Sequence, residues 1–229
     1  MNVQVVRKVL ERNLAAAEQN RTAFARRGIT CINLLGGPGC GKTTLLEGVL
    51  PRLTPHLRCA VLEGDPATTR DAERIAALRV PVVQLVTDGG CHLNADHVQR
   101  AIDELGSAPV DLLLIENVGN LVCPANFDLG EHARIAVLSV VEGDDKPAKY
   151  ALAFRTSQLV VLSKFDLLPY VRFDTAQVRV DLLRLNPELA IVETDAPSQR
   201  GFDSVAAWIR SRVALCAPQT ANPLCWKEG

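Results

Sequence analysis

Hydrophobic and polar residues follow two recurring patterns along this chain. Short runs rich in Val, Ile and Leu, with few polar interruptions, recur from one end of the sequence to the other. Continuous apolar runs of this length are typical of strands that are buried on both faces of a parallel sheet. We predict strands over 30–35, 57–65, 80–87, 111–117, 134–142, 158–166 and 189–194.

The segments between these runs place apolar residues at helical spacing. We predict helices over 5–28, 43–53, 71–79, 94–106, 174–186 and 202–213. Alternating strands and helices indicate an α/β fold, with a mostly parallel central sheet and helices on both faces. We therefore divide the chain into an N-terminal helix over 1–28, one domain over 29–215 and a loose, Pro-containing C-terminal tail over 216–229.

A glycine-rich loop follows the first predicted strand. Gly36, Gly41, Lys42 and Thr43 fit the pattern G-x-x-x-x-G-K-[ST], between a strand and a helix as a phosphate-binding loop requires. Its backbone N–H groups and the helix N-terminus would surround phosphate oxygens. Lys42 would reach the β- and γ-phosphates, and the Thr43 hydroxyl would hold Mg²⁺. The fold is thus predicted to be a P-loop NTPase whose nucleotide contacts are Gly36, Gly37, Pro38, Gly39, Cys40, Gly41, Lys42, Thr43 and Thr44.

Carboxylates follow two of the other predicted strands. Asp65 ends the second strand and Glu116 ends the fourth, and ligands of such sheets bind at the carboxyl ends of strands. Both are candidates to act on Mg²⁺ or on the attacking water. The segment 64–71 is a candidate switch, with Asp71 as a candidate for orienting water. The alternative for Asp71 is an ordinary acidic helix cap, and the sequence does not decide between the two.

The sixth predicted strand leads into the run SKFD, Ser163 to Asp166. This run matches three of the four positions of the N-K-x-D loop with which GTPases read guanine. Asp166 would accept hydrogen bonds from guanine that adenine cannot offer, and Lys164 would lie along the base. Ser163 departs from the usual asparagine, and the alternative is a charged loop end.

Three soft metal ligands lie in two short loops. Cys91 and His92 follow a pair of glycines, and Cys123 precedes a proline beyond Glu116. Thiolate and imidazole ligands suit Ni²⁺ and Zn²⁺ much better than Mg²⁺. The alternative is a set of unlinked cysteines, and the residues alone leave both possibilities open.

Composition limits the compartment and the classes of binding partner that we expect for this chain. The net charge of −1 favours neither nucleic acid nor an anionic membrane. No apolar run is long enough for a membrane span, and the N-terminus is too polar for a signal peptide. The seven cysteines are an odd number and one lies in the phosphate loop, so a reducing cytoplasm fits better than a disulfide framework.

Six segments together resemble the HypB family, GTPase accessory proteins for nickel insertion into [NiFe]-hydrogenases. They are GPGCGKTTLLE (37–47), EGDPATTRDAERI (63–75), GGCHLNADHV (89–98), IENVGNLVCPANFDLGE (115–131), SVVEGDDKPAKY (139–150) and SKFDLLPYV (163–171). The runs ENVGNLVCP and EGDDKP-x-KY are far more specific than the phosphate loop alone. The resemblance implies hydrolysis of GTP to GDP and phosphate, and the lack of an evident arginine finger indicates slow turnover. The catalytic candidates are Lys42, Asp65, Asp71 and Glu116, with Mg²⁺ held by Thr43 and Asp65.

The resemblance also implies a Ni²⁺ or Zn²⁺ site made of Cys91, His92 and Cys123. Three ligands are an incomplete set, so we expect a homodimer that shares the site and responds to GTP and metal. Implied partners are a HypA-type metallochaperone and the hydrogenase large-subunit precursor. Residues 1–30 contain neither Cys nor His, so no N-terminal nickel store is expected. The alternatives are a zinc-stabilised regulatory dimer and a GTPase chaperone for another metalloenzyme.

Overall fold

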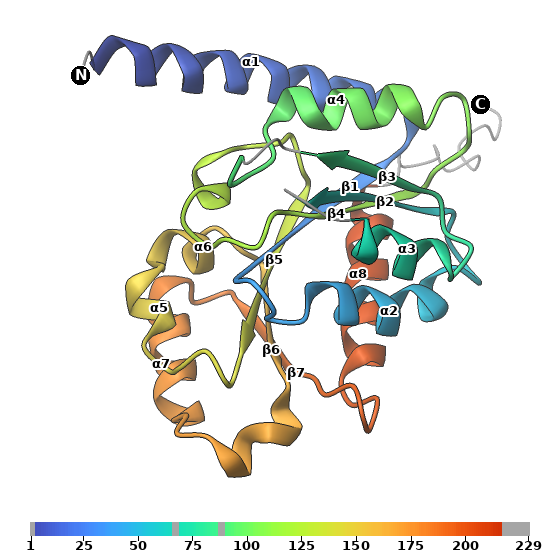
Figure 1. Ribbon diagram of the computed structural model, residues 1–229. Coiled ribbons are helices and arrows are strands. Elements are labelled where there is room, and N and C mark those ends of the chain that lie inside the picture. Colours follow the sequence, from blue (N-terminus) through green and yellow to red (C-terminus); the bar gives the residue numbers. More distant parts are fainter. Residues whose placement is uncertain (1–2, 66–68, 87–89, 217–229) are drawn as a thin grey trace, which may run out of the picture.

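A parallel sheet organises the computed structural model, which describes residues 3–65, 69–86 and 90–216, without the side chains of 3–8, Asp65 and Val86. The sheet has seven strands in the order β3-β2-β4-β1-β5-β6-β7, and all neighbouring strands run parallel. The fold class predicted from the sequence is confirmed (Figure 1). The strands are β1 (Thr30–Gly36), β2 (Cys59–Asp65), β3 (Val82–Val86), β4 (Leu112–Glu116), β5 (Ala133–Ser139), β6 (Leu159–Ser163) and β7 (Ala190–Glu193).

Helices connect the strands and cover both faces of the sheet. The longer ones are α1 (Val3–Arg27), α2 (Lys42–Leu53), α3 (Arg70–Ala76), α4 (Ala95–Glu104), α7 (Thr175–Leu185) and α8 (Phe202–Cys216). The sequence missed α5 (Lys146–Lys149), α6 (Ala151–Arg155) and the 3-10 turns η1 (Pro124–Asn126) and η2 (Phe165–Tyr170), which are too short to show a helical period. The predicted tail begins one residue too early, since α8 includes Cys216, and 217–229 lie outside the described residues.

Side chains that alternate along each strand supply separate hydrophobic cores. Ile32 and Leu34 of β1 pack with α2 and α8 on one face of the sheet. Cys31 lies on the other face, in a core with α1 and α4, while Leu35 joins the core beneath α6 and α7. Burial on both faces explains why these strands appear in the sequence as unbroken apolar runs.

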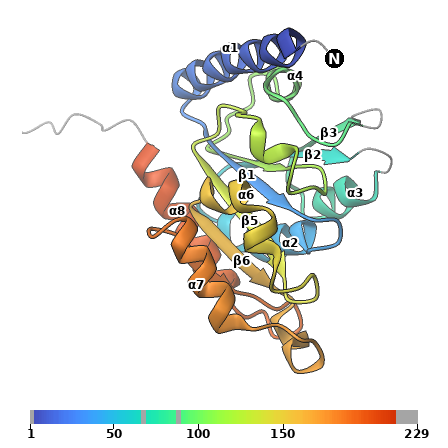
Figure 2. The same cartoon turned by 90° about the vertical axis from the view of Figure 1, so that its left-hand side faces the viewer.

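The N-terminal helix lies against α4 at one end of the molecule, as both views show (Figures 1 and 2). Two buried asparagines of α1 attach it there. Asn20 donates 2.9 Å hydrogen bonds to the carbonyls of Ala95 and Leu129, and Asn13 accepts a 2.9 Å bond from the Ala95 N–H. The helix is therefore fixed to the domain by specific polar contacts. Among the described residues, no helix is both long and apolar enough to span a bilayer.

Candidate functional site

The phosphate loop joins β1 to α2 at the carboxyl edge of the sheet. Gly39 and Gly41 adopt φ of +67° and +100°, values that side chains rarely allow and that let the backbone curl. Lys42 is buried, and its Nζ lies 3.5 Å from the Gly36 carbonyl, across the mouth of the loop. The loop thus has the conformation and the cation that phosphate binding needs.

Three carboxylates lie beside this loop. Glu116 of β4 is buried and accepts a 2.8 Å hydrogen bond from the Thr43 hydroxyl. Glu63 of β2 is paired with Glu116 in the sheet register, and oxygens of Glu63, Asp71 and Glu116 lie within 4.8 Å of one another. One oxygen of Glu63 and one of Glu116 are buried with no hydrogen-bond partner among the described residues. Because such atoms are costly to bury, and because oxygen ligands suit Mg²⁺, this donor set fits a magnesium ion.

The surroundings of the two buried glutamates favour a proton on Glu63 and a charge on Glu116. Burial raises the pKa of Glu63 to about 10, and the charge of Glu116 adds to the effect. Burial also raises the pKa of Glu116, but Lys42 and the Thr43 hydroxyl oppose that rise. The proton therefore stays on Glu63, which donates a hydrogen bond to Glu116. A divalent cation at this place would displace it.

The other predicted catalytic residues have separate positions. Asp65 ends β2, but its side chain lies outside the described residues, as do 66–68 of the predicted switch segment. Asp71 is not the N-cap residue of α3, which is Thr69, but it does lie in the acidic first turn that the helix-cap alternative describes. Its carboxylate pairs with Arg74 at 2.9 Å and lies close to the buried glutamates. Asp71 thus lies next to the site as well as in the first turn of α3.

A pocket of about 250 Å³ lies beside the phosphate loop, where β6 and β7 end. Lys164 and Asp166 line it, as the SKFD run predicts for a base-binding loop. Ser163 donates a 2.5 Å hydrogen bond to the Cys40 carbonyl, which ties this loop to the phosphate loop. The serine that departs from the usual asparagine thus has a structural contact of its own. The remaining lining residues are Gly41, Thr44, Leu45, Leu167, Thr194, Asp195, Ala196, Pro197 and Phe202.

The structure brings the three predicted soft ligands together. Donor atoms of Cys91, His92 and Cys123 lie within 4.8 Å of one another, and the Cys91 sulfur is 3.5 Å from His92 Nδ1. Cys91 is exposed, whereas the other two are half-buried. Asn94 caps α4 by accepting a 3.0 Å bond from the His97 N–H, so the chain turns immediately after the Cys-His pair. That turn lets adjacent residues face one ion.

The surroundings favour metal binding by the imidazole. The ring of His92 stacks on Phe127, with 3.8 Å between centroids and 27° between planes. Burial lowers the pKa of His92, so the ring is neutral and free to bind a metal at physiological pH. The hydrogen bond between the Cys91 and Cys123 thiols raises the pKa of Cys91.

Sequence reasoning missed two residues of these sites. One is Glu63, which lies two residues after the core residue Val61 and therefore on the same buried face of β2. An acidic residue at a buried strand position is a sequence signal for a functional site. Phe127 had no signal of its own, because only the folded chain brings it onto His92. The metal loops follow β3 and β4 and the phosphate loop follows β1, so the candidate metal site and the nucleotide site lie at the same edge of the sheet.

Comparison with known proteins agrees with this arrangement. Residues 30–193 match the family model of the CobW/HypB/UreG nucleotide-binding domain. The chain is 46% identical over 204 residues to the hydrogenase maturation factor HypB of Escherichia coli strain K12, covering 89% of this chain and 70% of that protein. This chain belongs to the HypB family. A probable HypB of Methanocaldococcus jannaschii is 37% identical, covering 92% of this chain and 96% of that protein.

Solved HypB structures share the fold. The Helicobacter pylori HypB, crystallised in complex with nickel, superposes with a TM-score of 0.85 at 32% identity, covering 92% of this chain and 99% of that one. The Archaeoglobus fulgidus HypB gives a TM-score of 0.83 at 34% identity, covering 89% of this chain and all of that one. The chain is thus a nucleotide-binding P-loop protein of a family of hydrogenase maturation factors.

Proposed function

We propose that this chain is a GTP-hydrolysing metallochaperone that carries nickel during the maturation of a [NiFe]-hydrogenase. The observation that carries the proposal is the cluster of Cys91, His92 and Cys123, with donor atoms within 4.8 Å of one another, at the sheet edge that holds the phosphate loop. The related HypB of Helicobacter pylori was crystallised with nickel, which supports nickel as the cargo here. Zn²⁺ favours the same ligands and is the competing metal.

The nucleotide site supports GTP hydrolysis assisted by Mg²⁺. Thr43 and Asp65 would hold the ion, and the carboxylates of Glu63, Asp71 and Glu116 would be further donors beside it. The ion would neutralise phosphate charge, and Lys42 would contact the phosphates. Asp71 and Glu116 are the carboxylates available to orient the attacking water. No arginine finger is evident in the sequence, so we expect slow turnover.

Asp166 and Lys164 support a preference for guanine. Both line the pocket beside the phosphate loop, and a carboxylate there accepts hydrogen bonds from guanine N–H groups.

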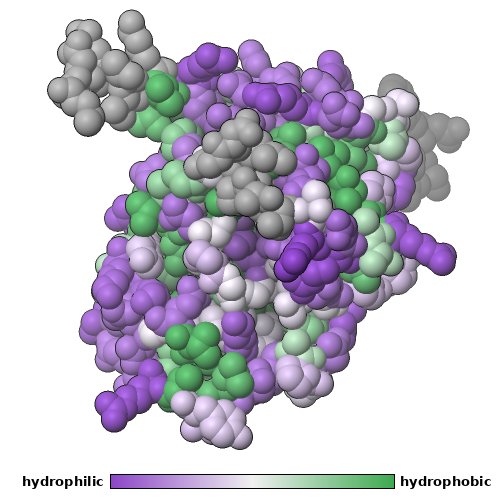
Figure 3. All heavy atoms as spheres, viewed as in Figure 1, coloured by the Kyte–Doolittle hydropathy of each residue, from purple (hydrophilic) through white to green (hydrophobic). Residues whose placement is uncertain are grey.

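A homodimer would complete the metal site. Three protein donors leave a coordination position open, and a second copy of the chain would supply further ligands. Hydrophobic residues gather at the lower end of the face in Figure 3, where η2 lies in Figure 1, and Leu167 of η2 is exposed. This surface lies away from α1, α4 and the metal loops (Figure 1), so a dimer that shares the metal site would need another contact. Val9, Leu10 and Val122 are exposed and line one pocket with His92 and Cys123, and they would suit that contact in a cytoplasmic complex. A HypA-type metallochaperone and the hydrogenase large-subunit precursor are the proposed partners.

Calorimetric titration of Ni²⁺ and Zn²⁺, with the protein loaded with GDP or a non-hydrolysable GTP analogue, tests this function. Molecular mass measured in parallel gives the stoichiometry per dimer. Cys91→Ser and Cys123→Ser should each abolish tight nickel binding. Cys216→Ser is the matched control, because Cys216 is also an exposed thiol but lies at the end of α8.

The outcomes separate the alternatives. Nickel binding of about one ion per dimer, with an affinity that depends on the nucleotide, supports a GTP-switched carrier. Zinc that stays bound through a full GTPase cycle, and whose chelation dissociates the dimer, would instead indicate a structural metal in a regulatory GTPase. Equal nickel affinity in both nucleotide states would contradict the carrier proposal.

A further inference from the structure

A buried polar network joins the nucleotide site to both metal-binding loops. It starts at Glu116, whose carboxylate accepts the Thr43 hydroxyl at 2.8 Å. The next residue, Asn117, is 1% exposed, and its backbone N–H donates to the Leu34 carbonyl at 3.1 Å. Asn117 is therefore held in the sheet, directly beside a residue that contacts the phosphate loop.

The side chain of Asn117 connects this position to the first metal loop. Its Oδ1 accepts a 3.1 Å hydrogen bond from the Leu93 N–H, one residue beyond His92. The same oxygen accepts the Val118 N–H at 3.0 Å. No other side-chain hydrogen bond of the described residues joins the 91–93 segment to the end of β4, so this amide is the direct connection.

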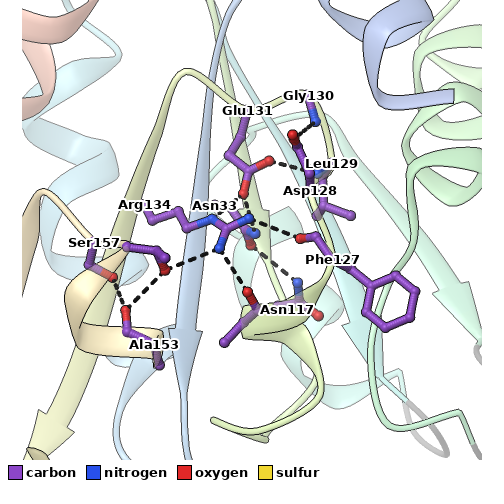
Figure 4. A network of polar contacts seen from close by, with 12 residues as sticks. Asn33, Asn117, Phe127, Asp128, Leu129, Gly130, Glu131, Arg134, Ala153 and Ser157 are labelled. Carbon is purple, nitrogen blue, oxygen red and sulfur yellow. Dashed lines mark hydrogen bonds and ion pairs between the residues drawn. The ribbon is translucent and has the colours of Figure 1, made fainter. Parts of the chain in front are cut away.

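The Nδ2 group of Asn117 connects to the second metal loop through a series of hydrogen bonds. Its Nδ2 donates to Asn33 Oδ1 at 3.2 Å, and Asn33 Nδ2 donates to Glu131 at 3.2 Å. Glu131 accepts the Arg134 guanidinium at 2.6 Å, and the side chains of these four residues lie in one continuous array (Figure 4). Asn33 is fully buried, and the side chains of Glu131 and Arg134 are 4% and 12% exposed.

Arg134 fixes the segment that follows Cys123. Its guanidinium donates to the carbonyls of Ala125 at 3.1 Å and Phe127 at 3.0 Å. Phe127 in turn stacks on His92. The two metal loops are thus attached to a single buried array, one by Asn117 and the other by Arg134. Because these hydrogen bonds are buried, breaking one of them leaves its donor or acceptor unpaired at a cost in free energy.

We propose that Asn117 is the positioning residue through which occupancy of the nucleotide site changes metal affinity, while Arg134 holds the 123–127 loop in any nucleotide state. When a cation and phosphate bind at Thr43 and Glu116, the end of β4 shifts. The hydrogen bond between Asn117 and the Leu93 N–H transmits this shift to Leu93. The orientation of Cys91 and His92 relative to Cys123 then changes. This inference rests on the proposed function, since it assumes that both ligands bind.

The test compares nickel affinity in the GDP and GTP-analogue states for several variants, with the wild type giving the reference ratio. Coupling of ordinary strength makes this ratio about fivefold or more. Asn117→Ala keeps all three metal donors but removes the bond to Leu93, and its ratio should fall below about twofold. Arg134→Lys loses the forked contact to two carbonyls, so nickel should bind more weakly in both states while the ratio is retained.

Asn20→Ala is the matched control. Asn20 is fully buried, and its amide donates to the carbonyls of Ala95 and Leu129, which lie just beyond the two metal loops. Neither of these bonds involves β4. A general loss of stability should therefore resemble this control, with the wild-type ratio retained. If Asn117→Ala does not fold, Asn117→Ser replaces it, because serine keeps a polar group at this buried position but is too short to accept from the Leu93 N–H. Thermal unfolding of each variant shows that it is folded.

Failure of the proposed function and failure of this inference give different results. A wild-type ratio near one would overturn the proposed function and this inference together. A wild-type ratio that survives in the folded Asn117 variant would overturn the inference alone. The same ratio lost in the Asn20 control would also overturn it, since the effect would then be one of general stability.

Discussion

Replacing Glu63 by glutamine should make the protein, without metal or nucleotide, increasingly more stable than wild type as the pH rises. Glu63 is 2% exposed and retains a proton because burial raises its pKa to about 10. Glutamine is neutral, of nearly the same shape, and its amide can still donate to Glu116. The variant therefore keeps the hydrogen bond that the protonated carboxyl donates. It avoids the free-energy cost of keeping that carboxyl protonated, which grows with pH.

The magnitude follows from the proton balance. Below pH 4.5, the ordinary value for glutamate, the folded and unfolded chains are both protonated and this cost is absent. Above it the unfolded chain releases the proton while the folded protein keeps it, so wild-type stability falls as pH rises towards the folded pKa. Each pH unit contributes at most about 1.4 kcal/mol. Allowing for relaxation of the site, the variant should gain about 2–4 kcal/mol over wild type between pH 5 and pH 8.

Urea unfolding at pH 5, 6, 7 and 8, in the presence of a chelator, measures this difference. Other groups with shifted pKa values, such as Glu142 and His92, are present in both proteins and cancel in the comparison. Glu73→Gln is a suitable control, since Glu73 is an exposed glutamate in α3. A difference between variant and wild type that stays constant across this pH range would refute the assignment of the proton to Glu63.

Three further predictions concern the metal, the base and the core. Phe127→Ala removes the ring on which His92 stacks at 3.8 Å, and nickel affinity measured against a chromophoric chelator should fall about fivefold. Asp166→Asn should reduce the preference for GTP over ATP about 100-fold or more in competition binding, because the guanine N–H groups lose their acceptor. Gly48→Ala puts a Cβ 2.4 Å from the Phe202 ring, so urea unfolding should show a net loss of about 1–2 kcal/mol despite the better helix propensity.

Each of these predictions has an outcome that contradicts it. Unchanged nickel affinity in Phe127→Ala would mean that the stack does not orient the imidazole. Unchanged selectivity in Asp166→Asn would place base recognition elsewhere in the pocket. For Gly48→Ala, stability equal to wild type would mean that Phe202 can move aside at no cost, and Phe202→Leu in the same background checks this by relieving the contact.

The sequence was sufficient for the sheet because its central strands, such as β1, β4 and β6, are buried on both faces. It overestimated the length of β5, since Val140 and Val141 continue the apolar run after the strand has ended at Ser139. The actual end is set by a turn in which Glu142 accepts the Ser139 N–H at 2.8 Å, a tertiary detail without a pattern. The phosphate loop, in contrast, is a local motif, and its predicted conformation follows from the glycine spacing alone.

The candidate sites divide in the same way. Residue type and spacing predicted Cys91, His92 and Cys123 as candidate metal ligands. Only the fold shows that the two loops that carry them, which follow different strands, meet. Glu63 and the Asn117 network depend on which strands are neighbours in the sheet. That order, with β4 between β1 and β2, is a property of topology that no local pattern in the chain encodes.

The uneven exposure of the soft ligands has a kinetic consequence. A closed tetrahedral site releases its metal slowly, because no incoming ligand can reach the ion before an old bond breaks. Here Cys91 is exposed while His92 and Cys123 are half-buried, so an acceptor would approach an ion bound by these three residues from one side. Exchange can then proceed ligand by ligand, with the two more buried donors keeping hold until the acceptor has bound. Such a site can combine tight binding at equilibrium with rapid transfer, and the rate would depend on the acceptor concentration rather than on spontaneous dissociation.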